Sequence, residues 1–351
     1  MKRILSAFAL LLGAFSTALL HAADTKAPSI WLPDVVSASG YQIDHLYMVI
    51  LAIVAIIFVI TEGLLLYSVI VFRAKPGVRA QYFHGSTAIE LVLAGIPVLI
   101  LLYLTFVSGH LWSDLKLHRP AAKDAIHVQV MGQQFAWNFR FSGADAAFGT
   151  ADDAMTLNEA YLPVGRAVIF HLSSKDVIHS FFLPESRMKQ DAVPGLLTSA
   201  WTQWDVLPVW DLKAQKRVLL SPEEYAKVDV AVSGYEFKSK PATKKAGWYQ
   251  ASDSAKISYF EYWYERKADE PVVVLRNGEA VKAEPQYVRH YFEIGCAQLC
   301  GTSHFAMRGT VRVVSDKEYQ AWLAKQTHDD YLAGTWNGLW DKFHPEFNRS
   351  L

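Results

Sequence analysis

The sequence is poor in cysteine and carries no net charge. Its 351 residues include only two cysteines, enough for one internal disulfide at most. No Cys-x-x-Cys-His motif occurs, so no c-type haem is attached to this chain. The 34 basic residues are balanced by 34 acidic residues, so charge gives no indication of a nucleic-acid partner. We find neither an internal repeat nor a low-complexity tract.

Apolar residues make up 52% of the chain, and they are concentrated near the N-terminus. Lys2 and Arg3 precede an apolar run over residues 4–20, and small residues follow at Ala22 and Ala23. This order is typical of a cleavable secretory signal. A transmembrane anchor is the alternative, but a run of only about 17 apolar residues before small residues favours cleavage.

Two further apolar runs, over residues 46–72 and 89–107, predict membrane-spanning helices. They contain about 27 and about 19 residues, enough to cross a bilayer. The loop between them carries Arg73, Lys75 and Arg79 and no acidic residue. By the positive-inside rule this loop is cytoplasmic, and the mature N-terminus and everything after the second run are outside. The same orientation follows from the secretory signal.

Glu62 lies inside the first predicted span, and Glu90 lies near the cytoplasmic start of the second. A carboxylate at membrane depth is costly, so each should face protein or water rather than lipid. An interfacial, snorkelling side chain is the alternative, more so for Glu90. We therefore expect the helix pair to dock against a larger membrane partner, and we take both residues as candidates for a proton path that such a partner completes.

From about residue 124 the apolar residues alternate with polar ones, which predicts strands. The stretch "AIHVQVMGQQFAWNFRF" (125–141) is predicted to be a half-buried strand, and "RAVIFHL" (166–172) and "GTVRVV" (309–314) have the same pattern. Short strands without long helices between them favour a sandwich or a barrel.

The segment between Leu196 and Val288 is harder to interpret. We expect a helix around residues 221–228, and the aromatic run 259–267 is either a strand or an interaction face. An inserted surface subdomain is favoured over a functional interface here. After the last strand, "VVSDKEYQAWLAKQ" is predicted to be helical.

Both cysteines belong to the motif Cys-x3-Cys-x3-His-x2-Met, formed by Cys296, Cys300, His304 and Met307. In an oxidising compartment two cysteines usually form a disulfide, which is the simpler interpretation. A disulfide, however, needs neither the histidine nor the methionine, whereas thiolates, imidazole and thioether suit copper. His179, which follows a predicted strand, is the best candidate for a ligand from elsewhere in the fold.

These motifs resemble subunit II of the haem–copper cytochrome c oxidases. The resemblance rests on "HGSTAIELVLAGIP", "MGQQFAWNF", "DVIHSFFLPESRMKQDAVPG" and "CAQLCGTSHFAMRG", and it covers most of residues 40–195 and 288–325. It implies a cupredoxin-like Greek-key β-sandwich that holds the binuclear copper centre CuA. Such a subunit takes electrons from cytochrome c and passes them to haem in subunit I, where oxygen reduction and proton translocation take place.

The resemblance also implies a ligand set for copper. Cys296 and Cys300 would bridge the two metals, with His179 and His304 as terminal ligands and with Met307 and the backbone carbonyl of Gln298 completing the shell. The family usually has a glutamate at the position of Gln298, where its carboxylate reaches a magnesium ion shared with subunit I. Gln298 keeps the carbonyl for copper but lacks the charge for magnesium.

Two more departures concern electron transfer. The family's "GHQWYW" reads "GQQFAW" here, so Phe135 stands at the usual tryptophan through which electrons enter, while Trp137 is kept. Electrons would then pass through Trp137, or the donor docks elsewhere. About 90 residues separate "DAVPG" from "EIGCAQLC", where the family has a much shorter hairpin, and we expect this insertion to contact the donor or another subunit.

The predicted organisation is a membrane-anchored all-β protein in a bacterial inner membrane. It consists of a signal peptide (1–23), a transmembrane hairpin (24–108), a periplasmic CuA domain (109–325) with an insertion at about 209–285, and a C-terminal tail (326–351). The expected partners are subunit I, other oxidase subunits, cytochrome c and membrane lipid. The alternatives are a copper-free quinol oxidase subunit II, which should lack the ligands, and a membrane-tethered copper-binding module.

Overall fold

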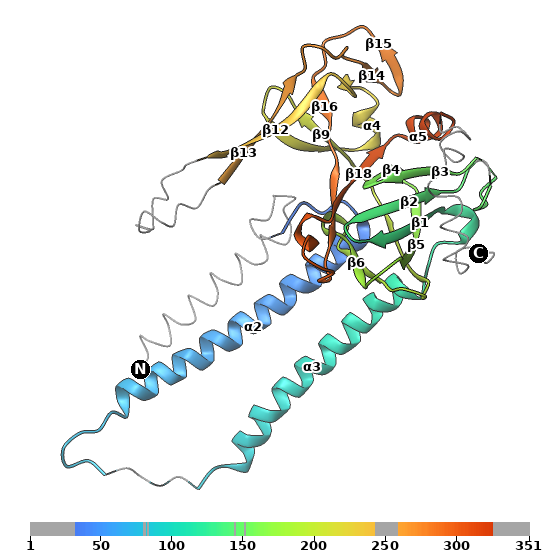
Figure 1. The fold of residues 1–351 in the computed structure, drawn as a ribbon. Helices are drawn as coiled ribbons and strands as arrows, with labels where there is room; N and C mark the ends of the chain where they lie inside the picture. The colour runs from blue at the N-terminus through green and yellow to red at the C-terminus, as the bar shows by residue number, and fades with distance from the viewer. Residues whose placement is uncertain are drawn as a thin grey trace. The chain divides into compact units, whose positions relative to one another are not determined.

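The computed structural model describes residues 32–325, apart from 80–81, 83, 144, 151 and 243–258. The predicted signal peptide and the C-terminal tail lie outside the described residues, as does part of the insertion. The described chain forms two units, a pair of apolar helices and a β-rich domain, which begins at Pro120 and also includes residues 35–38 (Figure 1). Each unit is described by itself.

The helical unit consists of α2 (Ala38–Val71) and α3 (Thr87–Lys116). Both helices are long and apolar enough to cross a membrane, and their apolar windows are not covered by protein. They extend beyond the predicted spans, chiefly at the extracytoplasmic ends, and this unit continues to Arg119 rather than ending at 108. Hydropathy identifies only the part of a helix that suits lipid, whereas backbone hydrogen bonding continues through polar residues that lie in water.

Two five-stranded sheets form the body of the β domain, as predicted for a sandwich. The first sheet has the order β3 (Ala154–Leu157), β2 (Ala136–Phe141), β1 (Ile126–Gln133), β5 (Ala167–Ser174) and β8 (Thr198–Gln203). The second has the order β4 (Glu159–Pro163), β18 (Arg308–Val314), β17 (Phe292–Cys296), β6 (His179–Leu183) and β7 (Met188–Ala192). Two pairs, β1 with β5 and β4 with β18, are parallel.

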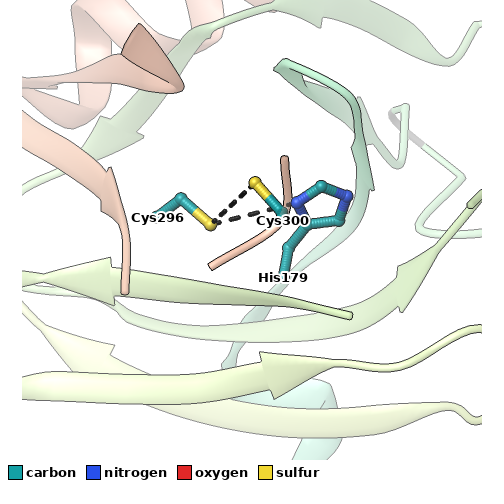
Figure 2. Close-up of side chains that lie close together, drawn as sticks. All are labelled: His179, Cys296 and Cys300. Carbon is teal, nitrogen blue, oxygen red and sulfur yellow. Dashed lines mark hydrogen bonds between the residues drawn. The ribbon is translucent and has the colours of Figure 1, made fainter. Parts of the chain in front are cut away.

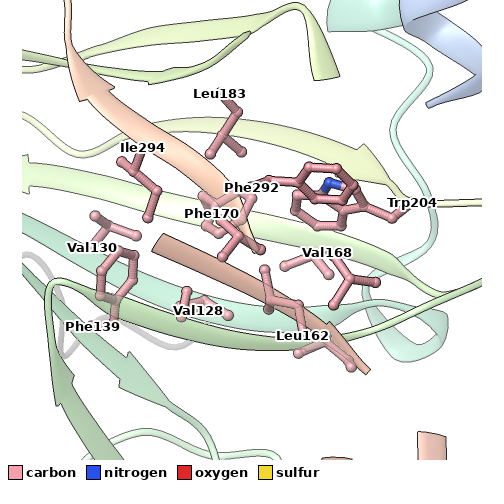
Figure 3. Packing of buried hydrophobic residues seen from close by; sticks show 14 of the residues in the cluster. Val128, Val130, Phe139, Leu162, Val168, Phe170, Leu183, Trp204, Phe292 and Ile294 are labelled. Carbon is pink, nitrogen blue, oxygen red and sulfur yellow. The ribbon is translucent and has the colours of Figure 1, made fainter. Parts of the chain in front are cut away.

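Large aromatic side chains fill the space between these sheets. The ring of Phe181 lies 5.2 Å from that of Trp137, 5.2 Å from that of Phe170 and 6.1 Å from that of Phe139. Figure 3 shows Phe139 and Phe170 in the same interior as Phe292 of the second sheet. Edge-to-face and tilted contacts of this kind favour one arrangement of the rings. They pack β2 and β5 of the first sheet against β6, which carries His179.

The stretch 125–141 is not the single half-buried strand that we predicted. It is a hairpin of β1 and β2 that turns at Gln134 and Phe135, with Gln133 paired to Ala136. Most of β1 is buried on both faces, because Met131 on the outer face packs against Met155 and Leu197 as well. The turn was missed because Gln-Gln-Phe contains none of the residues that usually mark turns.

The insertion folds into a sheet of its own, which supports the predicted surface subdomain. Its six strands have the order β10 (Lys216–Leu220), β9 (Leu207–Asp211), β16 (Tyr287–Arg289), β11 (Val230–Ala231), β14 (Val274–Arg276) and β15 (Glu279–Val281). A separate two-stranded ribbon pairs β12 (Tyr235–Ala242) with β13 (Tyr259–Arg266), so the aromatic run is a strand. The stretch "YVRHYFEI" divides between two sheets, since β16 belongs to the insertion and β17 to the sandwich.

The helices of the β domain are short. The one predicted around 221–228 is a single turn, α4 (Pro222–Tyr225), and the one predicted after the last strand is α5 (Asp316–Leu323). Each begins with a capping box. The serine side chain accepts a hydrogen bond from the backbone N–H of the glutamate three residues later, and the side chain of that glutamate accepts one from the backbone N–H of the serine. Three 3-10 turns complete the described elements: η1 (Ala122–Asp124), η2 (Pro184–Ser186) and η3 (His304–Ala306).

Two ion pairs join the inserted sheet to the sandwich. Arg289 on β16 pairs with Glu318 on α5, and both side chains are largely buried. Arg217 on β10 pairs with Glu185 at 3.2 Å, and its guanidinium lies 5.9 Å from the ring centre of Phe292. Through Arg217 the insertion therefore contacts β17, the strand that ends at the first cysteine.

Candidate metal centre

The candidate centre lies where two paired strands of the second sheet meet the long loop before β18. His179 is the first residue of β6, and Cys296 is the last residue of β17. The register pairs Cys296 with Phe181, which brings the histidine and the cysteine close together. The loop that follows Cys296 carries the other candidate ligands.

The two cysteines and His179 converge on one point (Figure 2). The Sγ atom of Cys296 lies 3.9 Å from the Sγ atom of Cys300 and 3.9 Å from Nδ1 of His179. Their ligand atoms all lie within 4.8 Å of one another, and this is the group of three metal-binding side chains found among the described residues. Both cysteines are free thiols, so the disulfide alternative is not the arrangement in this structure.

The remaining predicted ligands belong to the same cluster. Nδ1 of His304 lies 3.6 Å from Sγ of Cys300, and Sδ of Met307 lies 3.8 Å from that same sulfur. The thiol of Cys296 donates a hydrogen bond to the backbone carbonyl of Gln298 at 3.2 Å. The structure therefore brings together all six groups that the sequence analysis named.

The cluster is buried but lies just under the surface. His179, Cys300 and Met307 are buried, whereas Cys296 and His304 are half-buried. Side chains that are packed in this way have little freedom to move, and the buried members are shielded from water.

Burial and mutual interaction separate the acidities of the two thiols. Burial raises the pKa of Cys296, but hydrogen bonds that the sulfur accepts from His179 and from the backbone at Ser180 and Gln298 outweigh it and lower this pKa to about 6. Burial and the neighbouring Cys296 thiolate raise the pKa of Cys300 to about 11. Two adjacent thiolates repel each other, and a bound cation would remove that repulsion.

Asp176 is a site residue that the sequence analysis missed. Nε2 of His179 donates to its carboxylate at 2.8 Å, which leaves Nδ1 of the histidine facing Cys296. Carboxylates commonly orient metal-ligating histidines in this way. Asp176 could have been identified from the sequence, because it lies three residues before His179 and is the first residue of the motif "DVIHSFFLPESRMKQDAVPG".

The two residues considered for electron input differ in accessibility. Trp137 is 0% exposed, and its ring lies edge-on to that of His179 at 6.0 Å. Phe135 is only half-buried and packs on the core from the turn beside the cluster. Glu62 and Glu90 belong to α2 and α3 in the helical unit and are exposed on those helices.

Two family models match this chain. One, described as cytochrome C oxidase subunit II, transmembrane domain, matches residues 26–111, which include α2 and most of α3. The other, described as cytochrome C oxidase subunit II, periplasmic domain, matches residues 126–210. The chain belongs to the subunit II family of haem–copper oxidases. The second match ends at residue 210, inside β9, where the inserted sheet begins.

Curated relatives within the subunit II family support this assignment. The alternative cytochrome c oxidase subunit 2 of Bradyrhizobium diazoefficiens is 26% identical over 93% of this chain and 94% of its own length. The cytochrome c oxidase subunit 2 of Alkalihalophilus pseudofirmus is 30% identical over 53% of this chain and 51% of that relative. A cytochrome bo(3) ubiquinol oxidase subunit 2 from Buchnera aphidicola also matches, at 29% identity over 38% of this chain and 45% of that relative.

Among solved structures, the periplasmic domain of subunit II of cytochrome oxidase from Bradyrhizobium japonicum matches with a TM-score of 0.31. The identity is 18%, over 59% of this chain and 95% of that one. By the two family models, this subunit II chain is a membrane-anchored oxidase subunit with a periplasmic β domain.

Proposed function

We propose that this chain is the electron-input subunit of a terminal respiratory oxidase in a bacterial inner membrane. It holds the binuclear copper centre CuA, takes electrons from cytochrome c and passes them to haem in subunit I. The observation that carries this proposal is the convergence of two free thiols, two imidazoles, a thioether and a backbone carbonyl at one end of the sandwich.

The donor set fits a pair of copper ions better than a structural zinc ion. Two cysteines and two histidines would already satisfy the four positions of a tetrahedral zinc site. Met307 and the carbonyl of Gln298 lie against the same sulfurs and exceed that number. Thiolate and thioether ligands are soft and favour copper. The Sγ atoms of Cys296 and Cys300 lie 3.9 Å apart, so both cysteines could hold the same pair of metal ions.

When bound, the copper pair would supply a site that gains and loses one electron at a time. The protein contributes a fixed set of ligands. The ring of His179 is held between Asp176 and Cys296, and Cys300 is packed beneath the surface against Met307. Ligands held this firmly move little when the charge of the site changes, and surrounding contacts tune the potential.

The surface around the centre suits a protein partner. Leu299 and Phe305 are 76% and 78% exposed and lie on the ligand loop, residues 297–307 between β17 and β18. Val177 and Ile178 add apolar surface from the loop before His179. We propose that these exposed apolar side chains, which neighbour the candidate ligands in sequence, contact that partner. Because Trp137 is not exposed, we propose that Phe135 is the residue nearest the donor, with Trp137 behind it in the interior.

Two other functions are less well supported. A copper-free quinol oxidase subunit II, suggested by the match to a ubiquinol oxidase subunit 2, would not need the convergent thiols and imidazoles. A membrane-tethered copper-binding module would not need helices that match the oxidase transmembrane domain. The side chain of Gln298 is exposed and uncharged, so we propose that it holds no magnesium at the interface with subunit I.

The proposal is tested by rapid mixing of the purified oxidase complex with reduced cytochrome c or with a quinol. We expect the complex to oxidise cytochrome c, with this subunit reduced before the haems of subunit I. A Cys300→Ser variant of the complex should lose this first step. Oxidation of quinol alone, at a rate that the Cys300→Ser variant retains, would contradict the proposed function.

A further inference from the structure

The turn between β1 and β2 touches the candidate centre although none of its residues was predicted to bind metal. The backbone N–H of Gln134 donates to Oδ2 of Asp176 at 2.7 Å. The other oxygen of that carboxylate accepts from Nε2 of His179 at 2.8 Å. The turn thus binds directly to the carboxylate that orients His179.

The side chain of Gln134 reaches the other half of the centre. Its Nε2 atom donates to the backbone carbonyl of Cys300 at 2.5 Å. The next residue, Gly301, packs directly against the turn, since a Cβ there would lie 2.8 Å from Nε2 of Gln134 and 3.0 Å from Cζ of Phe135. Its φ of +137° is also one that glycine adopts readily and other residues rarely do. The ligand loop is therefore fitted closely to the turn.

We propose that Gln134 is a positioning residue for the metal centre, and this inference rests on the function proposed above. It fixes two ligands that come from distant parts of the chain: His179 through its backbone N–H and Asp176, and Cys300 through its side-chain amide. One residue thereby links the strand that carries the imidazole of His179 to the loop that carries the sulfur of Cys300.

The amide is needed because its partner is a carbonyl oxygen, which accepts hydrogen bonds and cannot donate them. Glutamate has the same shape as Gln134 but, when ionised, would place an acceptor against an acceptor. Methionine has a similar length and offers no donor. Removing the partners that orient metal ligands commonly lowers metal affinity by about 10-fold to 100-fold.

The test compares the full-length chain in detergent, loaded with copper, with its Gln134→Met and Gln134→Glu variants. Copper retention against a chelator and the paramagnetic resonance spectrum are measured, together with thermal unfolding of the metal-free proteins. We expect about tenfold weaker copper binding and altered copper hyperfine coupling in both variants. Thermal unfolding of the metal-free methionine variant should stay close to that of the wild type, because the side chain still fills the space.

Gln133→Met is the matched control, because Gln133 belongs to the same hairpin end but its side chain contacts Lys175 rather than the ligand loop. It should leave affinity and spectrum unchanged. If both Gln134 variants had the copper affinity and the spectrum of the wild type, this inference would be overturned while the proposed function would stand. A loss of affinity matched by an equal loss of stability in the metal-free chain would also overturn it. A wild-type chain without a two-copper signal would overturn the proposed function, and this inference with it.

Discussion

We expect His290 to make the junction between the inserted sheet and the sandwich sensitive to acid. It lies in the short link between β16 and β17 and is 7% exposed. Its ring lies 5.6 Å from that of Trp210, and Nδ1 is 3.1 Å from the hydroxyl of Tyr264. Burial, together with the positive charges of Arg217 and Arg312, lowers the pKa of His290 to about 3.

The sign of the effect on stability follows from the two states. The pKa of an unfolded histidine is about 6.5, so above about pH 7.5 both states are neutral and His290 has no effect. As the pH falls below about 6.5, His290 becomes protonated in the unfolded chain. In the folded chain it stays neutral until about pH 3, so acidification favours the unfolded state. At pH 5 the pH lies about 1.5 units below the pKa of the unfolded histidine, and each unit is worth about 1.4 kcal/mol. The free energy of unfolding should therefore fall by about 2 kcal/mol.

His290→Gln removes the titrating group and keeps a polar side chain beside Tyr264. The assay is urea unfolding of the metal-free full-length chain in detergent, at pH 7.5 and pH 5, followed by tryptophan fluorescence. Other groups titrate in both proteins, so the comparison is the loss on acidification in wild type minus the loss in the variant. We expect a difference of about 2 kcal/mol. Equal losses in the two proteins would refute the reasoning.

Three further outcomes are expected. Glu318→Gln should lower the stability of the β domain by about 3–5 kcal/mol because it leaves Arg289 buried without its carboxylate, and loss of under 1 kcal/mol in urea unfolding would contradict this. Replacing residues 238–263 by Asn-Gly, a two-residue turn that suits the paired Phe237 and Tyr264, should slow oxidation of cytochrome c without loss of copper; unchanged kinetics would mean that the ribbon does not contact the donor. Phe135→Ala should slow reduction of the centre by cytochrome c while the copper spectrum is kept, and an unaltered rate would exclude input at Phe135.

The cluster of candidate ligands could be anticipated from the sequence because five of its six members, the carbonyl of Gln298 included, are local. Cys296, Cys300, His304 and Met307 lie within one short loop, so their spacing alone brings their side chains together. His179 was identified because a second motif carried the same resemblance. The sheet register then explains why the two motifs meet, since β6 and β17 are neighbours.

The residues that support the ligands could not be predicted in the same way. Gln134 lies far from both motifs in the sequence, and only the hairpin of β1 and β2 brings it to Asp176 and Cys300. That hairpin was itself missed, because the turn has no residue that marks a turn. The pairing of Arg289 with Glu318 likewise depends on how the inserted sheet packs, which no periodic pattern records.

The most direct test of the account is the electron paramagnetic resonance spectrum of the copper-loaded full-length chain. The account predicts one unpaired electron coupled equally to two copper nuclei, with loss of this pattern in Cys296→Ser. A spectrum from a single copper ion would contradict it, and so would a mature protein in which Cys296 and Cys300 are joined as a disulfide and bind no metal.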